Sequence, residues 1–111
     1  MLHMLTCFDL KPAHTLEAFE QSLDQFTDQL RALDLVEHRG PVGRRVRDTI
    51  LDTDTERSHQ YFMLMQFRDR AQSDKAVSYI QSESEPTDST HRTMYSMVEN
   101  MIFICWQDIQ S

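Results

Sequence analysis

The sequence has few cysteines, few basic residues and no long apolar run. Two cysteines in 111 residues cannot build a disulfide framework or a metal-centred scaffold. The net charge of −7 repels phosphate backbones, so a nucleic-acid partner is not expected. No window approaches the roughly 20 apolar residues that a membrane span requires, and the N-terminal segment lacks a cationic leader. We therefore expect a cytoplasmic protein without a membrane span.

The rest of the composition suits one folded domain. A length of 111 residues is typical of a single domain, and 40% of the residues are hydrophobic, enough to bury a core. We expect residues 1–111 to form that single domain. Residues 82–90, SESEPTDST, offer little to bury and are predicted to be an exposed connection.

Hydrophobic periodicity predicts the order strand, helix, strand, strand, helix, strand. The clearest signal is a helix over residues 15–34, where apolar residues recur at spacings of three and four. Alternating or continuous apolar runs predict strands, and a short helical turn precedes the last one. The remaining expected elements are strands over 2–10, 43–52, 60–67 and 101–109, a helix over 71–82 and a turn over 92–98.

This order is typical of an α+β, ferredoxin-like βαββαβ sandwich. Its four-stranded antiparallel sheet carries two main helices on one face. The strands over 60–67 and 101–109 are nevertheless apolar on both faces, because Phe62, Leu64 and Ile104 alternate with an equally apolar set. Leaving that second face in water would cost several kcal/mol at about 25 cal/mol per Å². We therefore expect a second copy of the chain to cover it, giving a two-fold homodimer; a misplaced strand boundary or covering loops are the alternatives.

Five short segments stand out along the chain: FDLKP at 8–12, QYF at 60–62, FRD at 67–69, YI at 79–80 and NMIFI at 100–104. Together they resemble the dimeric α/β-barrel superfamily, above all the stress-responsive A/B-barrel proteins. The resemblance implies a ferredoxin-like fold that pairs into a dimeric α/β barrel. Met4 stands where the stress-responsive family usually has a histidine, and Ser82-Glu83 replaces its usual His-Pro pair.

A more distant resemblance links the chain to antibiotic-biosynthesis-type monooxygenases. The cofactor-free and haem-degrading members use an Asn, a Trp and a His around a cleft between sheet and helices. Those positions correspond here to Thr6, Tyr79 and a residue between Ser89 and His91. Neither Thr6 nor Tyr79 matches the family residue, and a phenol and a hydroxyl without a base make a poor acid–base set. We therefore name no catalytic residue.

The cysteines and histidines give no sign of a metal, a cofactor or a disulfide. Cys7 and Cys105 fall on strands expected to be neighbours, but a cytoplasmic location predicts that both stay reduced. The five histidines lack the short spacings of a metal site. The acidic run over 52–56 lacks the glycine of a calcium loop, since Arg57 occupies that position. We expect neither a metal nor a cofactor.

Methionine and arginine suggest a binding cleft. Seven methionines are many for this length, and the face carrying Met4, Met63 and Met65 opposes the helix stripe, so it either fills the core or lines a cavity for a flexible apolar ligand. Four arginines fall between 39 and 47, either as a solvated strand face or as an anchor for a carboxylate. The candidate ligand-binding residues are Met4, Thr6, Phe26, Met63, Met65, Tyr79, Arg45 and Arg47.

These patterns favour a small homodimer that binds an apolar or amphipathic, fatty-acid-like molecule between sheet and helices. One alternative is a cofactor-free, monooxygenase-like or isomerase-like enzyme. The other is a non-catalytic, stress-associated dimer with no ligand. The ligand and any reaction are not defined by the sequence.

Overall fold

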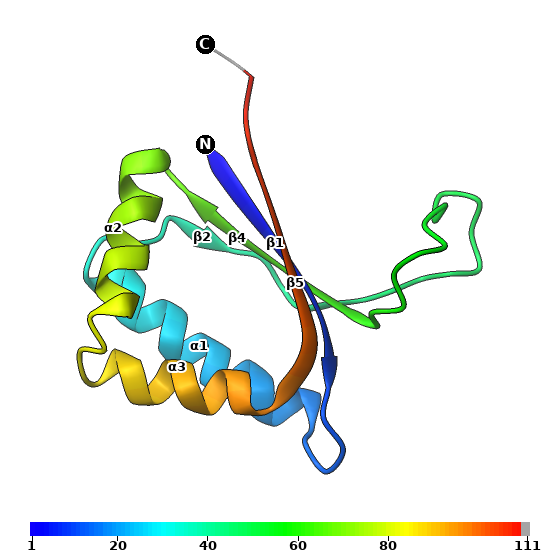
Figure 1. Cartoon of the computed structure of the whole chain (residues 1–111), viewed down its shortest axis with the longest axis horizontal. Coiled ribbons are helices and arrows are strands. Elements are labelled where there is room, and N and C mark those ends of the chain that lie inside the picture. Colours follow the sequence, from blue (N-terminus) through cyan, green and yellow to red (C-terminus); the bar gives the residue numbers. More distant parts are fainter. Residues whose placement is uncertain (110–111) are drawn as a thin grey trace.

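A computed structural model describes residues 1–109, which form a sheet with three helices (Figure 1). None of the helices in that range is both long enough and apolar enough to cross a membrane. In chain order the elements are β1 (Leu2–Leu10), α1 (Leu16–Ala32), β2 (His38–Arg39), β3 (Gly43–Arg44), β4 (Tyr61–Phe67), α2 (Arg70–Gln81), α3 (Thr87–Ser96) and β5 (Val98–Gln107).

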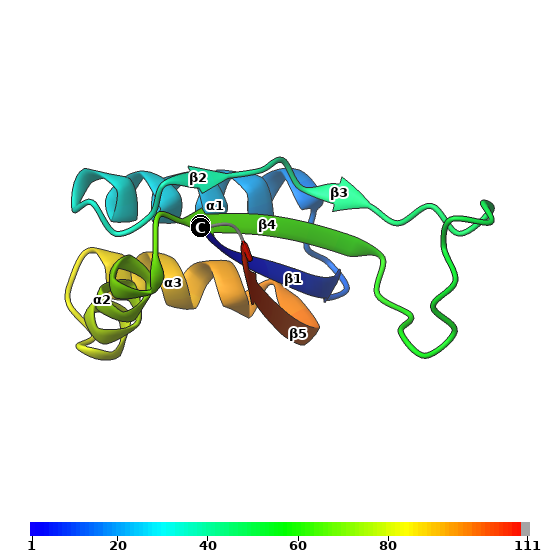
Figure 2. The same cartoon turned by 90° about the horizontal axis from the view of Figure 1, so that it is seen from above.

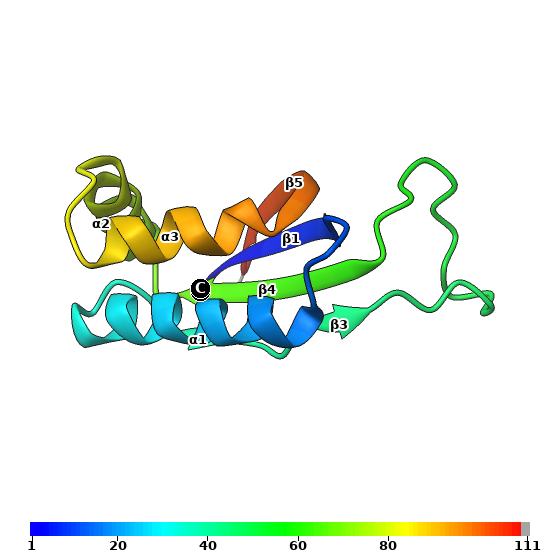
Figure 3. The same ribbon diagram turned by 90° about the horizontal axis from the view of Figure 1, so that it is seen from below.

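The sheet is antiparallel, with β1 at its centre. The strand order is β2-β4-β1-β5, and β3 also pairs with β4. In this register Met4 lies between Met65 on β4 and Cys105 on β5. All three helices lie on one side of the sheet (Figure 1), and α1 runs alongside α3 (Figure 3). The predicted α+β ferredoxin-like fold is confirmed.

Helix α1 follows the predicted stripe closely. The Oγ1 atom of Thr15 accepts a hydrogen bond of 3.1 Å from the backbone N–H of Ala18, which caps the first turn. Phe19, Leu23 and Leu30 are each at most 1% exposed and pack with the sheet. Burial of this stripe sets which face of the sheet the helix covers.

The other face of the sheet has no helix over it. We call this the open face; its side chains come from alternate positions of β1, β4 and β5 and are His3, Leu5, Cys7, Phe62, Leu64, Gln66, Ile102, Ile104 and Trp106. Ile102, Ile104 and Trp106 are 38, 39 and 45% exposed. At its edge the rings of His3 and Trp106 stack at 5.1 Å. The two-sided apolar pattern of the sequence therefore leaves one apolar sheet face uncovered.

The strand predicted over 43–52 is wrong for most of its length. Only Gly43 and Arg44 pair with β4, and the same edge of β4 is paired further along by β2, which precedes the predicted strand in the chain. Residues 45–60 leave the sheet as a long projecting loop, which we call the arm (Figures 1 and 2). Arg44 pairs with Tyr61, the first residue of β4, so no strand lies opposite the residues beyond it. The alternation of Val46 and Ile50 therefore leads to exposure, not burial.

The segment before the last strand is also more ordered than predicted. Instead of an exposed connection over 82–90 and a short turn over 92–98, helix α3 runs for ten residues from Thr87. Thr87 and Met94 are buried against the rest of the protein, because α3 packs beside α1. The last strand begins at Val98 and ends at Gln107, earlier at both ends than predicted.

The two cysteines lie on neighbouring strands but do not face each other. Cys7 pairs with Ile102, whereas Cys105 pairs with Met4, so the two side chains point to opposite faces of the sheet. Both thiols are free, with Cys7 buried and Cys105 exposed. Burial raises the pKa of the Cys7 thiol, against the opposing effect of the nearby Arg57 and Arg45 charges.

Candidate functional site

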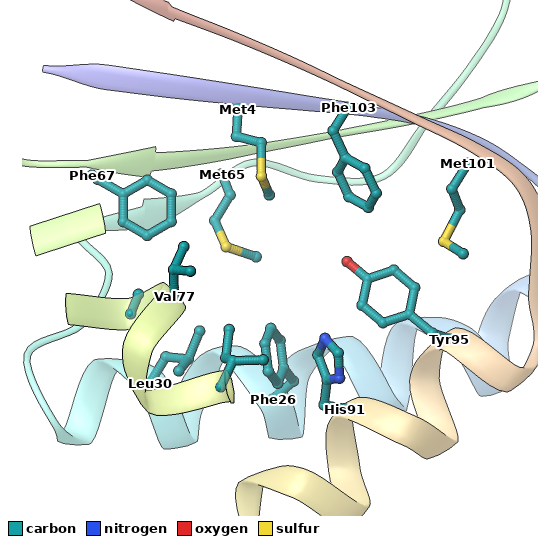
Figure 4. Close-up of a pocket in the computed structure, with 12 residues that line it drawn as sticks. Met4, Phe26, Leu30, Met65, Phe67, Val77, His91, Tyr95, Met101 and Phe103 are labelled. Carbon is teal, nitrogen blue, oxygen red and sulfur yellow. The ribbon is translucent and has the colours of Figure 1, made fainter. Parts of the chain in front are cut away.

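A cavity of about 440 Å³ lies between the helix-covered face of the sheet and the helices (Figure 4). Its size falls within the range of small-molecule sites, roughly 300–1,000 Å³. Its walls come from β1, β4, β5 and all three helices, and they are almost entirely apolar. The lining residues are Met4, Phe26, Leu30, Met65, Phe67, Ala76, Val77, Ile80, His91, Tyr95, Met101 and Phe103.

The cavity has a buried floor and an exposed rim. On the floor, Phe26, Leu30 and Met65 are at most 3% exposed. On the rim, Val77 of α2 is 51% exposed and Phe103 of β5 is 48% exposed. The mouth therefore lies between α2 and the edge strand β5. An apolar molecule entering there would contact side chains that are already shielded from water.

Four aromatic rings form one continuous wall from α1 across α3 to β5. The ring centroids of Phe26 and His91 are 5.3 Å apart, and those of His91 and Tyr95 are 4.8 Å apart with an edge-on arrangement. Tyr95 then meets Phe103 edge-on at 6.2 Å. Such arrangements are favoured by the ring quadrupoles, so the wall is fixed in shape.

His91 and Tyr95 are the titratable groups of this wall. Burial lowers the pKa of His91 below its usual 6.5, which keeps the imidazole neutral at pH 7, and it raises the pKa of Tyr95 to about 12. Within residues 1–109, neither the imidazole nor the phenol hydroxyl makes a hydrogen bond. Figure 4 shows the hydroxyl of Tyr95 pointing into the cavity. The two groups can therefore donate to or accept from an oxygen of a bound molecule.

The structure brings three of the predicted ligand-binding residues, Met4, Phe26 and Met65, to the cavity wall. Met4 contributes a thioether there. Thr6 and Met63 share the same sheet face and are each 1% exposed, but they lie in the core outside the cavity lining.

The other three predicted residues lie outside the cavity wall. The Tyr79 hydroxyl accepts a hydrogen bond of 3.5 Å from the hydroxyl of Thr87, between α2 and α3. Arg45 lies at the base of the arm, where its guanidinium bonds both carboxylate oxygens of Asp52 at 2.7 and 2.8 Å. Arg47 is exposed on the arm. The structure therefore does not place the arginine cluster at the mouth of the cavity.

Tyr95 and Phe103 line the cavity but were not predicted from the sequence, and His91 was considered only within the segment 89–91 of the monooxygenase resemblance. The signal was present, because His91 and Tyr95 are four residues apart and so share one face of a helix. A helix extending back to Thr87 would have revealed it. Among residues 1–109, no group of three His, Cys, Asp or Glu side chains is placed to hold a metal ion.

A protein-family model matches residues 1–109. The chain belongs to DUF6614, a family of unknown function. Among curated proteins, none matches the sequence. The family assignment covers every element described above but carries no activity.

Solved structures with the same fold share little sequence with this DUF6614 chain. The protein At3g17210 of Arabidopsis thaliana has a TM-score of 0.74 at 7% identity, over 100% of this chain and 98% of that one. A dimeric ferredoxin-like protein of unknown function from Jannaschia sp. CCS1 has a TM-score of 0.64 at 15% identity, covering 96% and 98%. SnoaB, a cofactor-independent oxygenase from Streptomyces nogalater, has a TM-score of 0.60 at 6% identity, covering 99% and 94%. The fold is thus that of the dimeric α/β-barrel proteins.

Proposed function

We propose that this DUF6614 chain binds a small apolar or amphipathic molecule in the cavity between sheet and helices. The observation that carries the proposal is the lining: twelve residues around about 440 Å³, with His91 and Tyr95 as its polar groups. A ligand that buries eight to ten methylenes there gains about 0.8 kcal/mol for each. That sum supports micromolar binding after the cost of association.

The charges around the mouth favour a neutral polar end over a carboxylate. Arg92 lies on the surface next to His91 and Tyr95, but it already pairs with Asp88 at 2.8 Å and Glu83 at 3.4 Å. The predicted anchors Arg45 and Arg47 are on the arm. A hydroxyl or carbonyl oxygen can instead bond Tyr95 or His91, and it does not need an unpaired cation.

The test compares two ligands of equal chain length by titration calorimetry. We expect 1-decanol to bind saturably at micromolar concentration and decanoic acid at pH 7.5 to bind more weakly. Val77→Trp, at the rim, should close the entrance and abolish binding of 1-decanol. Leu33→Trp is the matched control, because Leu33 is an apolar residue of similar exposure, 49%, at the end of α1 and outside the lining.

Two results would overturn the binding proposal. One is the absence of saturable binding of 1-decanol and decanoic acid to the wild type, which would favour the alternative of a stress-associated dimer without a ligand. The other is equal binding by wild type and Val77→Trp. Tighter binding of the acid than of the alcohol would restore the predicted carboxylate ligand.

We also infer that the chain is a homodimer through its open face. The uncovered Ile102, Ile104 and Trp106 support this, and structural relatives with the same fold are dimeric. Sedimentation at micromolar concentration should give a dimer, and a monomer would contradict the inference. A cytoplasmic location and a single domain over residues 1–111 stay predictions from the sequence.

An enzymatic role is the second candidate, favoured by the neutral imidazole of His91 in the wall of an apolar cavity. Such a base suits removal of a proton next to a carbonyl, the first step of an isomerase-like reaction. The test is exchange of the α-protons of 2-decanone for deuterium in D₂O, followed by NMR. The enzymatic role predicts faster exchange with the wild type than with His91→Gln. Equal rates would contradict the enzymatic role and leave ligand binding as the only proposed function.

A further inference from the structure

The arm, residues 45–60, is anchored firmly at both ends. The backbone N–H of Arg45 donates to the carbonyl of Gln60 at 2.8 Å, closing the base of the arm. The Nε2 atom of His59 donates to the carbonyl of Asn100 at 2.5 Å, and the N–H of Gln60 donates to Oδ1 of Asp9 at 3.0 Å. These bonds tie the arm to β1 and β5, so its direction is set by the sheet.

The interior of the arm is held by one nearly buried guanidinium. The side chain of Arg45 is only 6% exposed. Besides its two bonds to Asp52, it donates to the backbone carbonyl of Asp54 at 2.9 Å and to that of Arg57. One side chain thus joins the outgoing and returning halves of the arm. A charge-assisted, bidentate cluster of this kind gives the loop a defined shape.

The tip of this ordered loop is apolar and fully exposed. Ile50 is 95% exposed, Leu51 is 87% exposed and Val46, on the way out, is 60% exposed. The surrounding residues are mainly charged or hydroxylated. A pair of large aliphatic side chains at the end of a shaped loop is unfavourable in water and indicates a contact surface.

The arm stands beside the open face. Figure 1 shows it extending from the start of β4 and rising on the side of the sheet opposite the helices. Its base lies next to the open face, since the charges of Arg57 and Arg45 act on the buried Cys7. A body stacked on the open face would therefore lie alongside the arm.

We propose that the arm clasps a second copy of this chain, with Ile50 and Leu51 packed on the partner stacked against the open face. The proposal rests on the inferred homodimer. The open face alone presents nine side chains, fewer than half of the roughly 20 to 30 residues per side in a stable interface. The arm adds sixteen residues to the same surface. In a two-fold dimer the arm of each protomer would pack on the other protomer, so every contact occurs twice.

The experiment measures the dimer dissociation constant by sedimentation for the double variant Ile50→Asp/Leu51→Asp. Loss of two buried aliphatic side chains predicts a dissociation constant raised at least about tenfold. Leu33→Asp places one carboxylate on an exposed apolar site outside the arm and the open face, and it should leave the constant unchanged. Circular dichroism of both variants reports whether the fold is retained.

A photoreactive residue locates the contact directly. With p-benzoylphenylalanine at position 50, irradiation should give a covalent dimer whose linked peptide belongs to the other protomer. A wild-type dimer with an unchanged dissociation constant in the double variant, or with links only within one protomer, overturns the clasp and leaves the homodimer standing. A monomeric wild type overturns both. Neither outcome affects binding of 1-decanol to the cavity.

Discussion

The two faces of the sheet are built from similar side chains but have different surroundings. On the helix-covered face, Met63 and Met65 are at most 2% exposed under α1. On the open face, Ile104 and Trp106 of β5 are 39 and 45% exposed. Composition does not separate the two faces. The helices do, because three of them lie on one side and only the base of the arm reaches the other.

This difference assigns separate tasks to the faces. The covered face holds the cavity and its two titratable groups, so it is suited to a small molecule. The open face is shallow and apolar, and it adjoins a shaped loop with an apolar tip, so it is suited to a protein surface. Substitutions on the two faces should therefore change different measured properties.

The largest effect is expected from truncation under the helices. Leu23 of α1 is 0% exposed and is part of the core. Leu23→Ala should lower the free energy of unfolding by about 2 to 5 kcal/mol, the sum of lost transfer energy and a residual cavity. Urea denaturation measures it. The exposed Leu33→Ala provides the control, and an equal loss in the two variants would show that the helix-covered face is not the core.

The next effect concerns the open face. Ile104→Asp should raise the dimer dissociation constant at least about 100-fold, because both protomers would bury an unpaired carboxylate at the interface. Binding of 1-decanol should not change, since Ile104 is outside the cavity lining. An unchanged dissociation constant would mean that the protomers associate through another surface. The open face would then not be the dimer interface.

The sequence predicted the faces better than it predicted the loops. The stripe of α1, the runs of β1, β4 and β5 and their two-sided apolar character are local signals, and the structure follows them. The strand over 43–52 failed because strand formation depends on a partner, and β4 begins only at Tyr61. Residues beyond Arg44 have an alternating apolar pattern, but within residues 1–109 no neighbouring strand is available to pair with them.

The candidate site was predictable only in part, for a similar reason. Met4 and Met65 follow from strand parity, and Phe26 follows from the helix stripe. The prediction of Tyr95 would have required the full length of α3. The sequence of α3 is polar, and the helix is stabilised by packing on α1. The sequence places Arg45 in a cluster of arginines, but its ion pair with Asp52 could not be predicted. That bond crosses the arm and depends on the path of the loop.

A smaller effect distinguishes the two thiols. Cys105 is exposed, whereas Cys7 is buried and its thiol pKa is raised. A thiol reagent should label Cys105 at least about tenfold faster than Cys7 in the folded protein, and both at similar rates after unfolding. Cys105→Ser should remove the fast phase. Equal native rates would mean that Cys7 is not buried in the folded protein.

The smallest effect tests the cavity through His91. Burial against Phe26 and Tyr95 lowers the pKa of this imidazole below 6.5; Asp88 opposes the shift and Arg92 adds to it. Between pH 6.5 and the lowered folded-state pKa, the unfolded chain binds a proton that the folded protein does not. Stability from this group is therefore present above pH 6.5 and is lost as the pH falls through that window.

His91→Gln removes this titration while keeping a polar side chain of similar length. As the pH is lowered from 7.5 to 5, the Tm of the wild type should fall more than that of the variant, by on the order of 1–2 °C. Saturating 1-decanol should widen the difference, because a neutral ligand over the ring increases the cost of charging it. A wild type that gains stability relative to the variant in acid would mean that His91 is charged in the folded protein. The cavity would then contain a positively charged imidazole. Decanoic acid, not 1-decanol, would become the expected ligand.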